Sequence, residues 1–464
     1  MAALTVEDVV RGTQGALVGG DLAVPVAGVS IDSRSLAVGQ AFFAIHGHRL
    51  DGHAFLRDAA ARGAACVVVH ALPDELPPTV AVVLVEDTTR ALGRLAAYHR
   101  ARFTVPVAAV TGSNGKTTTK EMMASVLAAL GLVLKPESSF NNQWGLPLTL
   151  LRLSPEHRAV ALELGANMPG EIAMLAAICR PTIGAVTMVA SAHTEFFGSL
   201  DGVQAEKSAL VRAIPAEGAV VLNADDTRVI AMRPLTAARV LTVSASDPRA
   251  DVCAIGAAGE TEEGLRVTLE IAGARREVRL RFAGRHNVGN ALAAAGVGLA
   301  LGLPPDDIAR GLEAARPVKG RCVWKRAGSV RILDDTYNAN PTSLRAALDT
   351  LLAVRQGRRR MVVLGDMLEL GDLAEAAHRE AGRAVAAAGA SEFIGVGPLS
   401  RLAVEAAREA GLAESHHAAT FEDTVALLLK RLAPGDVLLV KGSRGMRMER
   451  VVDALVARLG GEDG

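Results

Sequence analysis

The chain has 464 residues, with 50 Lys and Arg residues balanced by 50 Asp and Glu residues. At about 150 residues per domain, this length predicts roughly three domains, each able to bury its own core. The neutral charge and the 3% aromatic content argue against nucleic-acid binding, which normally needs a basic surface and stacking side chains. Because the segment MAALTVEDVVRG is acidic where a signal peptide is basic, and no apolar run can span a bilayer, we expect a cytoplasmic protein.

Residues 1–100 alternate short apolar segments with helical ones. We expect strands over VSIDSR, AFFAI and ACVVVH, a helix over HAFLRDAAARG and a proline-rich bend over ALPDELPPTV. This pattern predicts a small α/β domain.

Residues 101–315 have longer apolar runs separated by helices. The runs VPVAAV, AVALELG, TIGAVTMV and GAVVLNADD each end in polar or glycine residues, and a more alternating section, LRVTLEIAGARREVRLRFAG, precedes the helical NVGNALAAAGVGLALG. Such runs predict a parallel sheet covered on both faces, with ligands at the carboxyl ends of its strands.

Residues 316–464 show the same alternation of apolar runs and helices in a shorter segment. Apolar runs in VRILDDTYNANP, MVVLGDML, EFIGVG and VLLVKGS alternate with helical segments. We therefore expect a second, smaller doubly wound sheet of the Rossmann type.

The four cysteines, Cys66, Cys179, Cys253 and Cys322, are scattered singly and lack metal-binding spacing. We expect ordinary reduced thiols.

The segment TGSNGKTTT, residues 111–119, follows an apolar strand and opens a helix, which is the context that defines a phosphate-binding loop. Two glycines would let backbone N–H groups converge on a polyphosphate, while the lysine adds charge and the following threonine can reach a bound Mg²⁺. The residues expected to bind ATP here are Gly112, Ser113, Asn114, Gly115, Lys116, Thr117 and Thr118.

This loop has the short spacing G-x-x-G-K-T and resembles the ATP loop of the Mur ligases and the folylpolyglutamate synthetases, which form amide bonds with ATP. Seven further segments resemble, in order, the Mur ligases that add D-alanyl-D-alanine: FNNQWGLPLTLL, LELGANMPGEI, AHTEFFGSLDGV, GRHNVGNALAA, LDDTYNANPTSLRAAL, VLGDMLELG and LVKGSRGMRME. They extend from about residue 140 to residue 450, and the resemblance as a whole begins near Ser30.

The resemblance implies a monomeric ligase of three α/β domains in peptidoglycan precursor synthesis, whose substrates are ATP, UDP-N-acetylmuramoyl-tripeptide and D-alanyl-D-alanine. Residues 1–100 would bind the UDP-sugar peptide, residues 101–315 ATP, and residues 316–464 would complete the ligase site. The peptide carboxylate would become an acyl phosphate before the amine attacks. Because this reaction gathers negative charge, we expect Mg²⁺, with two ions implied by the resemblance.

Three residues are candidates for the metal chemistry. Glu163 ends an apolar strand, where a buried carboxylate needs an ion-pair partner or a metal. His193 is either a hydrogen-bonded loop histidine or a functional group, and Lys207 would ordinarily be a solvated helix lysine. The resemblance implies that these three residues and Thr117 serve the Mg²⁺ sites, that Lys207 is carbamylated, and that Lys116, His193, Lys207 and Arg321 are catalytic.

Four residues of the second half are candidates for nucleotide binding. Asn287 and Asn290 share one face of a helix start, where an N-cap role competes. Arg321 is otherwise a surface arginine, and Asp335 belongs to an Asx-rich turn after a strand. The resemblance implies adenine-nucleotide contacts for the two asparagines and for Asp335, and it implies that Arg321 approaches the ATP phosphates when the C-terminal domain closes.

The candidate substrate-binding residues lie in three segments. The resemblance implies that Ser30, Asp32, Ser33 and Arg34 hold the uridine diphosphate, that Asn141 and Asn142 contact the same substrate, and that Asn338 and Asn340 line the reacting groups. Clusters of Ser, Asp and Arg at strand ends are common without a ligand, and a turn rich in Asx residues is the competing explanation for Asn338 and Asn340.

Other functions remain as alternatives. A Mur ligase that adds diaminopimelate typically carries a D-N-P-R motif, whereas this chain has YNANP at the comparable place. A folylpolyglutamate synthetase does not explain the N-terminal domain. A P-loop kinase or a nucleotide-binding regulatory module would form no amide.

Overall fold

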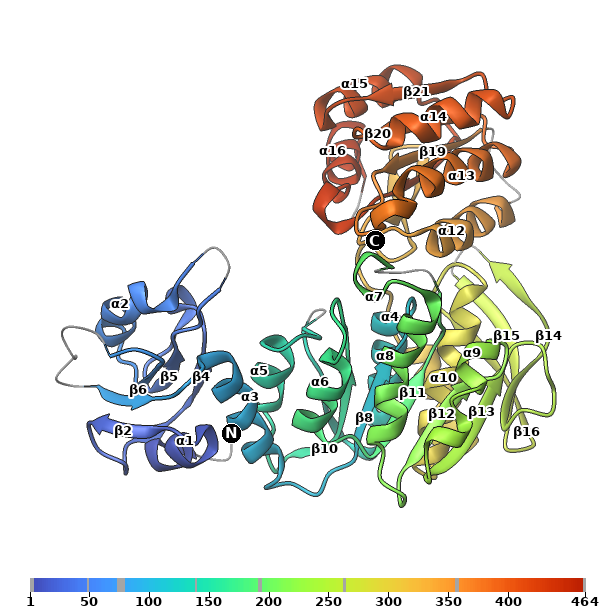
Figure 1. Ribbon diagram of the computed structural model, residues 1–464. Helices are drawn as coiled ribbons and strands as arrows, with labels where there is room; N and C mark the ends of the chain where they lie inside the picture. The colour runs from blue at the N-terminus through green and yellow to red at the C-terminus, as the bar shows by residue number, and fades with distance from the viewer. Residues whose placement is uncertain are drawn as a thin grey trace.

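The computed structural model describes residues 4–47, 50–72, 80–137, 140–190, 194–261, 264–354 and 359–461. Three α/β units follow one another along the chain (Figure 1). We call them the first unit (β1 to α3), the central unit (β8 to α11) and the third unit (β17 to α16). No helix in the described ranges is long and apolar enough to cross a membrane.

The first unit contains a five-stranded sheet of order β2-β7-β6-β5-β4, in which only β2 is antiparallel to its neighbour. Its core strand β6 has four consecutive buried residues because both faces of the sheet are covered. The expected proline-rich bend lies mostly outside the described residues. The elements are β1 (Leu4–Thr5), α1 (Val6–Thr13), β2 (Ala16–Gly19), β3 (Pro25–Val26), β4 (Gly28–Ser30), β5 (Gln40–Phe43), α2 (Leu56–Ala61), β6 (Cys66–Val69), β7 (Ala81–Leu84) and α3 (Thr88–Arg100).

The central unit contains a nine-stranded sheet of order β16-β15-β14-β13-β12-β11-β8-β10-β9. Helices α4 and α10 pack on one face, and α8 packs on the other with α6 beside it. The strands are β8 (Val107–Thr111), β9 (Leu132–Leu134), β10 (His157–Glu163), β11 (Ile183–Val186), β12 (Ala219–Asn223), β13 (Arg239–Ser244), β14 (Val252–Thr261), β15 (Gly264–Ile271) and β16 (Ala274–Leu280). The helices are α4 (Lys116–Leu127), α5 (Gly145–Leu150), α6 (Glu171–Cys179), α7 (Thr194–Phe197), α8 (Leu200–Ala213), α9 (Thr227–Ile230), α10 (His286–Ala300) and α11 (Pro305–Ala314).

The expected parallel sheet is confirmed from β9 to β14, but β15 and β16 extend it as antiparallel strands. Their alternating sequence predicted strands without predicting this pairing. Ala272 and Gly273 connect the two strands with φ values of 49° and 82°, the left-handed conformation that a tight hairpin requires.

The third unit confirms the second doubly wound sheet. Its strand order is β17-β18-β22-β19-β20-β21, and only the edge strand β17 is antiparallel. The elements are β17 (Val323–Ala327), β18 (Val330–Asp335), α12 (Pro341–Ala353), β19 (Arg360–Gly365), α13 (Ala374–Ala387), β20 (Glu392–Val396), α14 (Ser400–Glu409), β21 (Ser415–Ala418), α15 (Phe421–Arg431), β22 (Val437–Lys441) and α16 (Glu449–Leu459).

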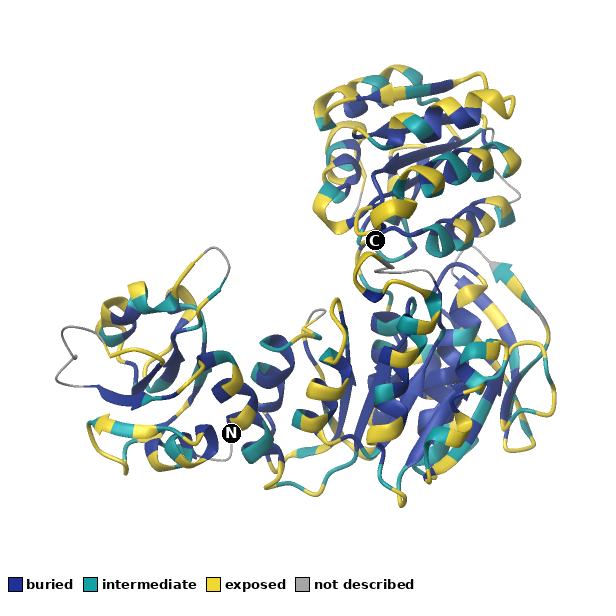
Figure 2. Ribbon diagram, viewed as in Figure 1, coloured by how far each residue is buried: buried dark blue, intermediate teal, exposed yellow. Residues whose placement is uncertain are grey.

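One apolar core joins the first two units, whereas the clusters of the third unit include Ala283 of the central unit. One cluster of buried side chains runs from α1 through α3 to α5 and α6 of the central unit. The sheet of the third unit has two clusters of its own, one on each face. Figure 2 shows these buried strands under helices with exposed outer faces.

Candidate active site

A cleft of about 1210 Å³ lies between the central and third units. Its walls come from the carboxyl ends of β8, β10 and β12 and from those of β18, β19 and β22. The cleft thus lies at the carboxyl ends of strands from both sheets, which is where the sequence predicts that ligands bind.

The phosphate-binding loop connects β8 to α4. Gly112 and Gly115 have φ values of 149° and 80°, and a Cβ on Gly115 would meet Asn290 Oδ1 at 2.2 Å. Ser113 fixes the loop to the end of β11, because its hydroxyl donates to the Ala190 carbonyl at 2.9 Å. The Lys116 ammonium donates to the carbonyl oxygens of Gly112 and Ser113 at 2.9 and 3.3 Å. The lysine thus lies over the loop that it is expected to serve.

Glu163 is 2% exposed and accepts two hydrogen bonds. The Thr117 hydroxyl donates to its Oε2 at 2.6 Å, and the Asn141 amide donates to its Oε1 at 2.7 Å. Both donors are neutral. The nearby charges of Lys116 and Lys207 also interact with the Glu163 carboxylate.

Lys207 lies on α8 and is 2% exposed, so the solvated-lysine interpretation is wrong. Its Nζ lies 5.6 Å from the centre of the Phe197 ring. Burial lowers the pKa of Lys207 to about 7, and the charge of Lys116 acts in the same direction. A large fraction of this amine is therefore neutral near pH 7.

Asn287 and Asn290 connect α10 to the phosphate-binding loop. Asn290 Nδ2 donates to Asn287 Oδ1 at 2.8 Å, and the Thr119 hydroxyl donates to Asn290 Oδ1 at 3.1 Å. Both asparagines line the cleft beside His286, whose pKa is lowered by burial. Asn287 is not the N-cap, which is Arg285.

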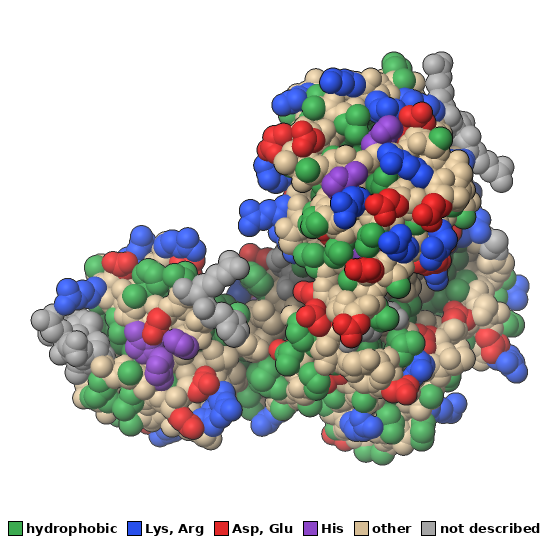
Figure 3. All heavy atoms as spheres, turned by 45° about the horizontal axis from the view of Figure 1, so that its top comes forward, with side chains coloured by type: hydrophobic (Ala, Val, Ile, Leu, Met, Phe, Trp, Pro, Cys, Tyr) green, Lys and Arg blue, Asp and Glu red, His purple; other side chains and the backbone are tan. Residues whose placement is uncertain are grey.

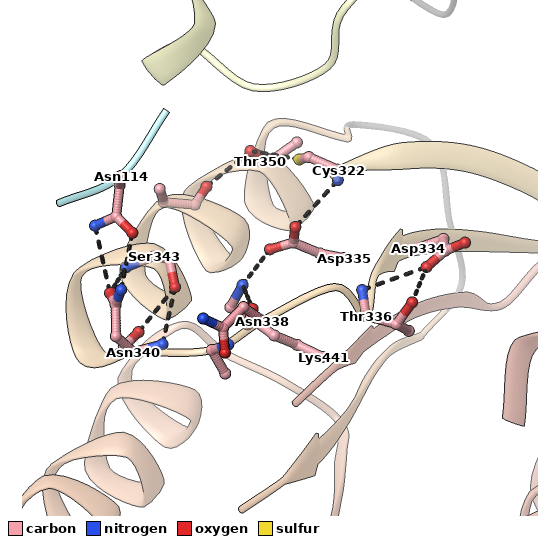
Figure 4. Close-up of polar contacts among 12 residues, drawn as sticks. Asn114, Cys322, Asp334, Asp335, Thr336, Asn338, Asn340, Ser343, Thr350 and Lys441 are labelled. Carbon is pink, nitrogen blue, oxygen red and sulfur yellow. Dashed lines mark hydrogen bonds and ion pairs between the residues drawn. The ribbon is translucent and has the colours of Figure 1, made fainter. Parts of the chain in front are cut away.

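The third unit contributes a positively charged wall. The Arg321 guanidinium lies 3.9 Å from the centre of the Tyr337 ring, and that of Arg444 lies 5.5 Å from it. Lys441 Nζ donates to Asp335 Oδ2 at 2.5 Å and to the Asn338 carbonyl at 2.9 Å (Figure 4). Lys441 thereby supports the loop from Asp335 to Asn340, which faces the central unit.

The expected uridine-binding residues lie in the first unit and are not among the residues that line the cleft. Asp32 forms a two-pronged ion pair with Arg34, with Oδ2 to Nη2 at 2.7 Å. Ser30 accepts from the Asp32 N–H at 3.1 Å, and Ser33 begins the following short helix. Asn142 lines the cleft with Asn141, and His193 lies outside the described residues.

Two buried residues of the site escaped the sequence interpretation. Glu206 accepts from the N–H groups of Gly170 and Ile172 at 2.7 Å each, and so ties α8 to the start of α6. Lys441 ends an apolar strand, the same signal that drew attention to Glu163. That signal could have found Lys441, whereas Glu206 had only its position next to Lys207.

A separate cluster, His46, His53 and His70 around Asp51, lies on the surface of the first unit (Figure 3). His53 uses both ring nitrogens, with Nδ1 at 2.7 Å from Asp51 and Nε2 accepting from the His70 N–H at 3.2 Å. Among the described residues, no group of three or more His, Cys, Asp or Glu side chains has a geometry suited to a metal ion.

Known family models match the three units in turn. The models are the Mur ligase family, catalytic domain (residues 25–100), the Mur ligase middle domain (110–298) and the Mur ligase, glutamate ligase domain (320–444). The chain belongs to the Mur ligase family of ATP-dependent ligases.

Within that family, the chain is similar to ligases whose names specify D-alanyl-D-alanine and to structures of MurF. The UDP-N-acetylmuramoyl-tripeptide–D-alanyl-D-alanine ligase of Mycobacterium tuberculosis is 39% identical over 470 residues, covering 92% of both chains. A crystal structure of MurF from Acinetobacter baumannii matches with a TM-score of 0.91 and 32% identity, over 99% of this chain and 100% of that one. MurF from Thermotoga maritima, in complex with ADP, matches with a TM-score of 0.82 and 27% identity, over 93% and 97% of the two chains.

Proposed function

We propose that this protein joins D-alanyl-D-alanine to UDP-N-acetylmuramoyl-tripeptide with ATP, in peptidoglycan precursor synthesis. The observation that carries the proposal is that one cleft contains the phosphate-binding loop, the Glu163 carboxylate and the loop from Asp335 to Asn340. The names of the relatives supply the substrates. We place the reaction in the cytoplasm, because ATP is present there. We also propose that the protein is a monomer.

The reaction needs a leaving group on a carboxylate. An oxygen of the tripeptide's terminal carboxylate attacks the γ-phosphorus, and ADP leaves. The dipeptide amine then attacks the carbonyl carbon of the acyl phosphate, phosphate leaves with that oxygen, and the nitrogen loses a proton. Lys116 and Arg321 would hold phosphate oxygens, and residues that stabilise charge in this way contribute most of such catalysis.

The oxygen atoms around Glu163 fit Mg²⁺. This ion is usually bound by one or two carboxylates together with phosphate oxygens and water, and Glu163 and the Thr117 hydroxyl offer oxygen ligands beside the phosphate-binding loop. When bound, Mg²⁺ would neutralise charge on the phosphates. We propose Glu163 and Thr117 as ligands of one ion, and His193 and Lys207 as residues of a second site.

We also propose that Lys207 is carbamylated. The neutral amine would bond to the carbon of CO₂ and release a proton, which turns a buried cation into a carboxylate-bearing anion. Its burial and its lowered pKa, about 7, favour this step. We expect enzyme depleted of CO₂ and bicarbonate to lose turnover and to recover it when bicarbonate is restored, whereas Lys207→Met should not recover.

We propose that the remaining candidate residues bind different substrates in different domains. Asn287, Asn290 and Asp335 would contact the nucleotide, and Ser30, Asp32, Ser33 and Arg34 would hold the uridine diphosphate in a first domain of residues 1–100. Asn141 and Asn142 would contact the extended substrate between that domain and the central one (101–315). Asn338 and Asn340 of the last domain (316–464) would line the amine site.

The test is ADP release measured with each substrate omitted in turn. We expect release to require both the UDP-tripeptide and D-alanyl-D-alanine, with a much higher kcat/KM for this dipeptide than for D-alanine or L-alanyl-L-alanine, because placement of the amine decides the rate. A stable phosphorylated product would instead indicate a kinase, and no turnover a regulatory module. Preference for diaminopimelate with the shorter precursor would indicate the sister ligase.

A further inference from the structure

A reciprocal amide pair joins the phosphate-binding loop to the third unit. Asn340 Nδ2 donates to Asn114 Oδ1 at 2.8 Å, and Asn114 Nδ2 lies 3.4 Å from Asn340 Oδ1 (Figure 4). The two residues are 226 positions apart in the chain. This contact directly links the loop expected to hold ATP with the loop expected to receive the amine.

Each partner is held firmly on its own side. Asn114 belongs to the tight turn before α4, where its carbonyl accepts from the Thr187 hydroxyl at 2.7 Å. Asn340 is the N-cap of α12, and its Oδ1 also accepts from the Ser343 N–H at 2.8 Å. The Ser343 hydroxyl in turn accepts from the Asn340 N–H at 3.0 Å. Asn340 is only 9% exposed, so water competes poorly for its amide.

We infer that the Asn114–Asn340 pair couples the two binding events, so that occupation of the phosphate-binding loop positions the loop for the amine. The inference rests on the proposed function, since that function places the amine beside Asn338 and Asn340. Asn340 is here a positioning residue, acting through Asn114 and through the loop that it ends.

The geometry gives the coupling its direction. Asn114 Oδ1 accepts a hydrogen bond from Asn340 Nδ2 at 2.8 Å. If phosphate binding shifts Asn114, the start of α12 must move with it, or this hydrogen bond breaks. The other end of the same loop is held by Lys441, which donates to the Asn338 carbonyl. A loop fixed at one end and tied to the nucleotide loop at the other has little freedom to respond in another way.

Asn340→Ser separates this contact from the cap. Serine caps a helix about as well as asparagine does, but it is too short to replace the amide donor toward Asn114. We therefore expect the thermal midpoint of Asn340→Ser to stay within about 3 °C of the unsubstituted protein. Ser343→Ala is the matched control, because it removes half of the capping box and leaves both atoms of the amide pair in place.

The measurement is calorimetric binding of D-alanyl-D-alanine to the full chain saturated with the UDP-tripeptide and Mg²⁺, with and without the β,γ-imido analogue of ATP. In the unsubstituted protein we expect the analogue to tighten dipeptide binding at least about fivefold, the lower end of typical coupling between sites. The ratio of the dipeptide Kd without the analogue to the Kd with it should fall to about one in Asn340→Ser and in Asn114→Ser. Ser343→Ala should keep the ratio of the unsubstituted protein. The double variant should resemble either single variant.

A ratio of one in the unsubstituted protein, or an unchanged ratio in both single variants, would overturn the inference. So would a Ser343→Ala variant that loses the ratio, because cap stability would then explain the effect. If Asn340→Ser fails to fold, Asn114→Ser still tests the inference, because it removes the other partner of the amide pair. A protein that ligates the dipeptide but shows no coupling contradicts this inference alone, whereas one that never uses the dipeptide contradicts the proposed function as well.

Discussion

Burial determines the chemistry of two charged residues: Glu163, which lines the cleft, and Lys207, which is not among the lining residues. Glu163 is buried and accepts from a hydroxyl and an amide, both neutral donors, beside the charges of Lys116 and Lys207. Lys207 is buried as deeply, and its pKa falls to about 7 because an ammonium is costly to desolvate. Two equally buried groups thus differ, because the carboxylate is hydrogen-bonded by neutral donors whereas the amine favours its neutral form.

Lys116→Ala should abolish turnover without changing stability. Among the described residues, the Lys116 ammonium hydrogen-bonds to the loop carbonyls of Gly112 and Ser113, so its loss removes charge at the phosphates and little packing. Removing a group that stabilises the charge of the transition state typically lowers kcat by about 10²–10³-fold. Assayed by ADP release, Lys135→Ala is the matched control, because Lys135 is exposed and pairs with Glu121. Near-normal release by a folded Lys116→Ala protein would contradict the assignment of the loop.

Among the helices of the central unit, α6 begins against a carboxylate of α8. The N-cap of α6 is Gly170, which has no side chain to accept from the first N–H groups of the helix. The Glu206 carboxylate takes that role from the neighbouring helix and adds a favourable charge at the N-terminus.

Glu206→Ala should therefore lower the free energy of unfolding by about 2 kcal/mol, because the buried Ile172 N–H and the part-buried Gly170 N–H lose their acceptor. Glu206→Gln keeps one acceptor oxygen and should lose less. Urea unfolding measures both, and the exposed Glu217→Ala should change little. Equal losses in the alanine and glutamine variants would show that charge, not hydrogen bonding, is what α6 requires.

His99 on α3 provides a pH dependence at the junction of the first and central units. Its Nε2 donates to the Leu153 carbonyl at 2.9 Å, and burial lowers the pKa of His99 below its usual value near 6.5. The unfolded chain therefore binds a proton before the folded one does, so the stability present above pH 6.5 is lost as the pH falls through the folded pKa.

The expected loss from His99 is at most about 1.4 kcal/mol per pH unit. Urea unfolding of the unsubstituted protein and of His99→Gln at pH 7.5 and 5.5 measures it. The glutamine variant keeps an amide donor but cannot titrate, so its stability should fall less over this interval. The same slope in both proteins would contradict the role of His99.

The shared core makes the first and central units one cooperative body, while the third unit has cores of its own. Calorimetry should accordingly resolve two transitions. The larger transition is that of the first and central units together. Leu95→Ala, in the shared core, should lower the free energy of unfolding of this part by about 2–5 kcal/mol, whereas Leu428→Ala should destabilise only the third unit. A Leu95→Ala variant that splits the larger transition would show that the first unit unfolds independently.

Local patterns in the sequence were sufficient for most elements of the fold. Apolar runs predicted the strands because a strand buried on both faces has few polar positions, and the glycines with Lys116 predicted the phosphate-binding loop. Alternation predicted β15 and β16 as strands, but not that they would join the edge of the parallel sheet. The functional division at residues 100 and 315 stays a prediction.

The contacts between distant residues were decided by the tertiary structure. Asp335 and Lys441 pair because β18 and β22 lie side by side and end at the same level, although 106 positions separate them. The sequence around Lys207 predicts a solvated surface lysine. Lys207 is buried because α8 packs on β11 and α6. Asn114 meets Asn340 only when two separately folded sheets present their carboxyl ends to the same cleft. Periodicity records which face of an element is buried, but the partner on that face depends on strand order and register, which nonlocal packing determines.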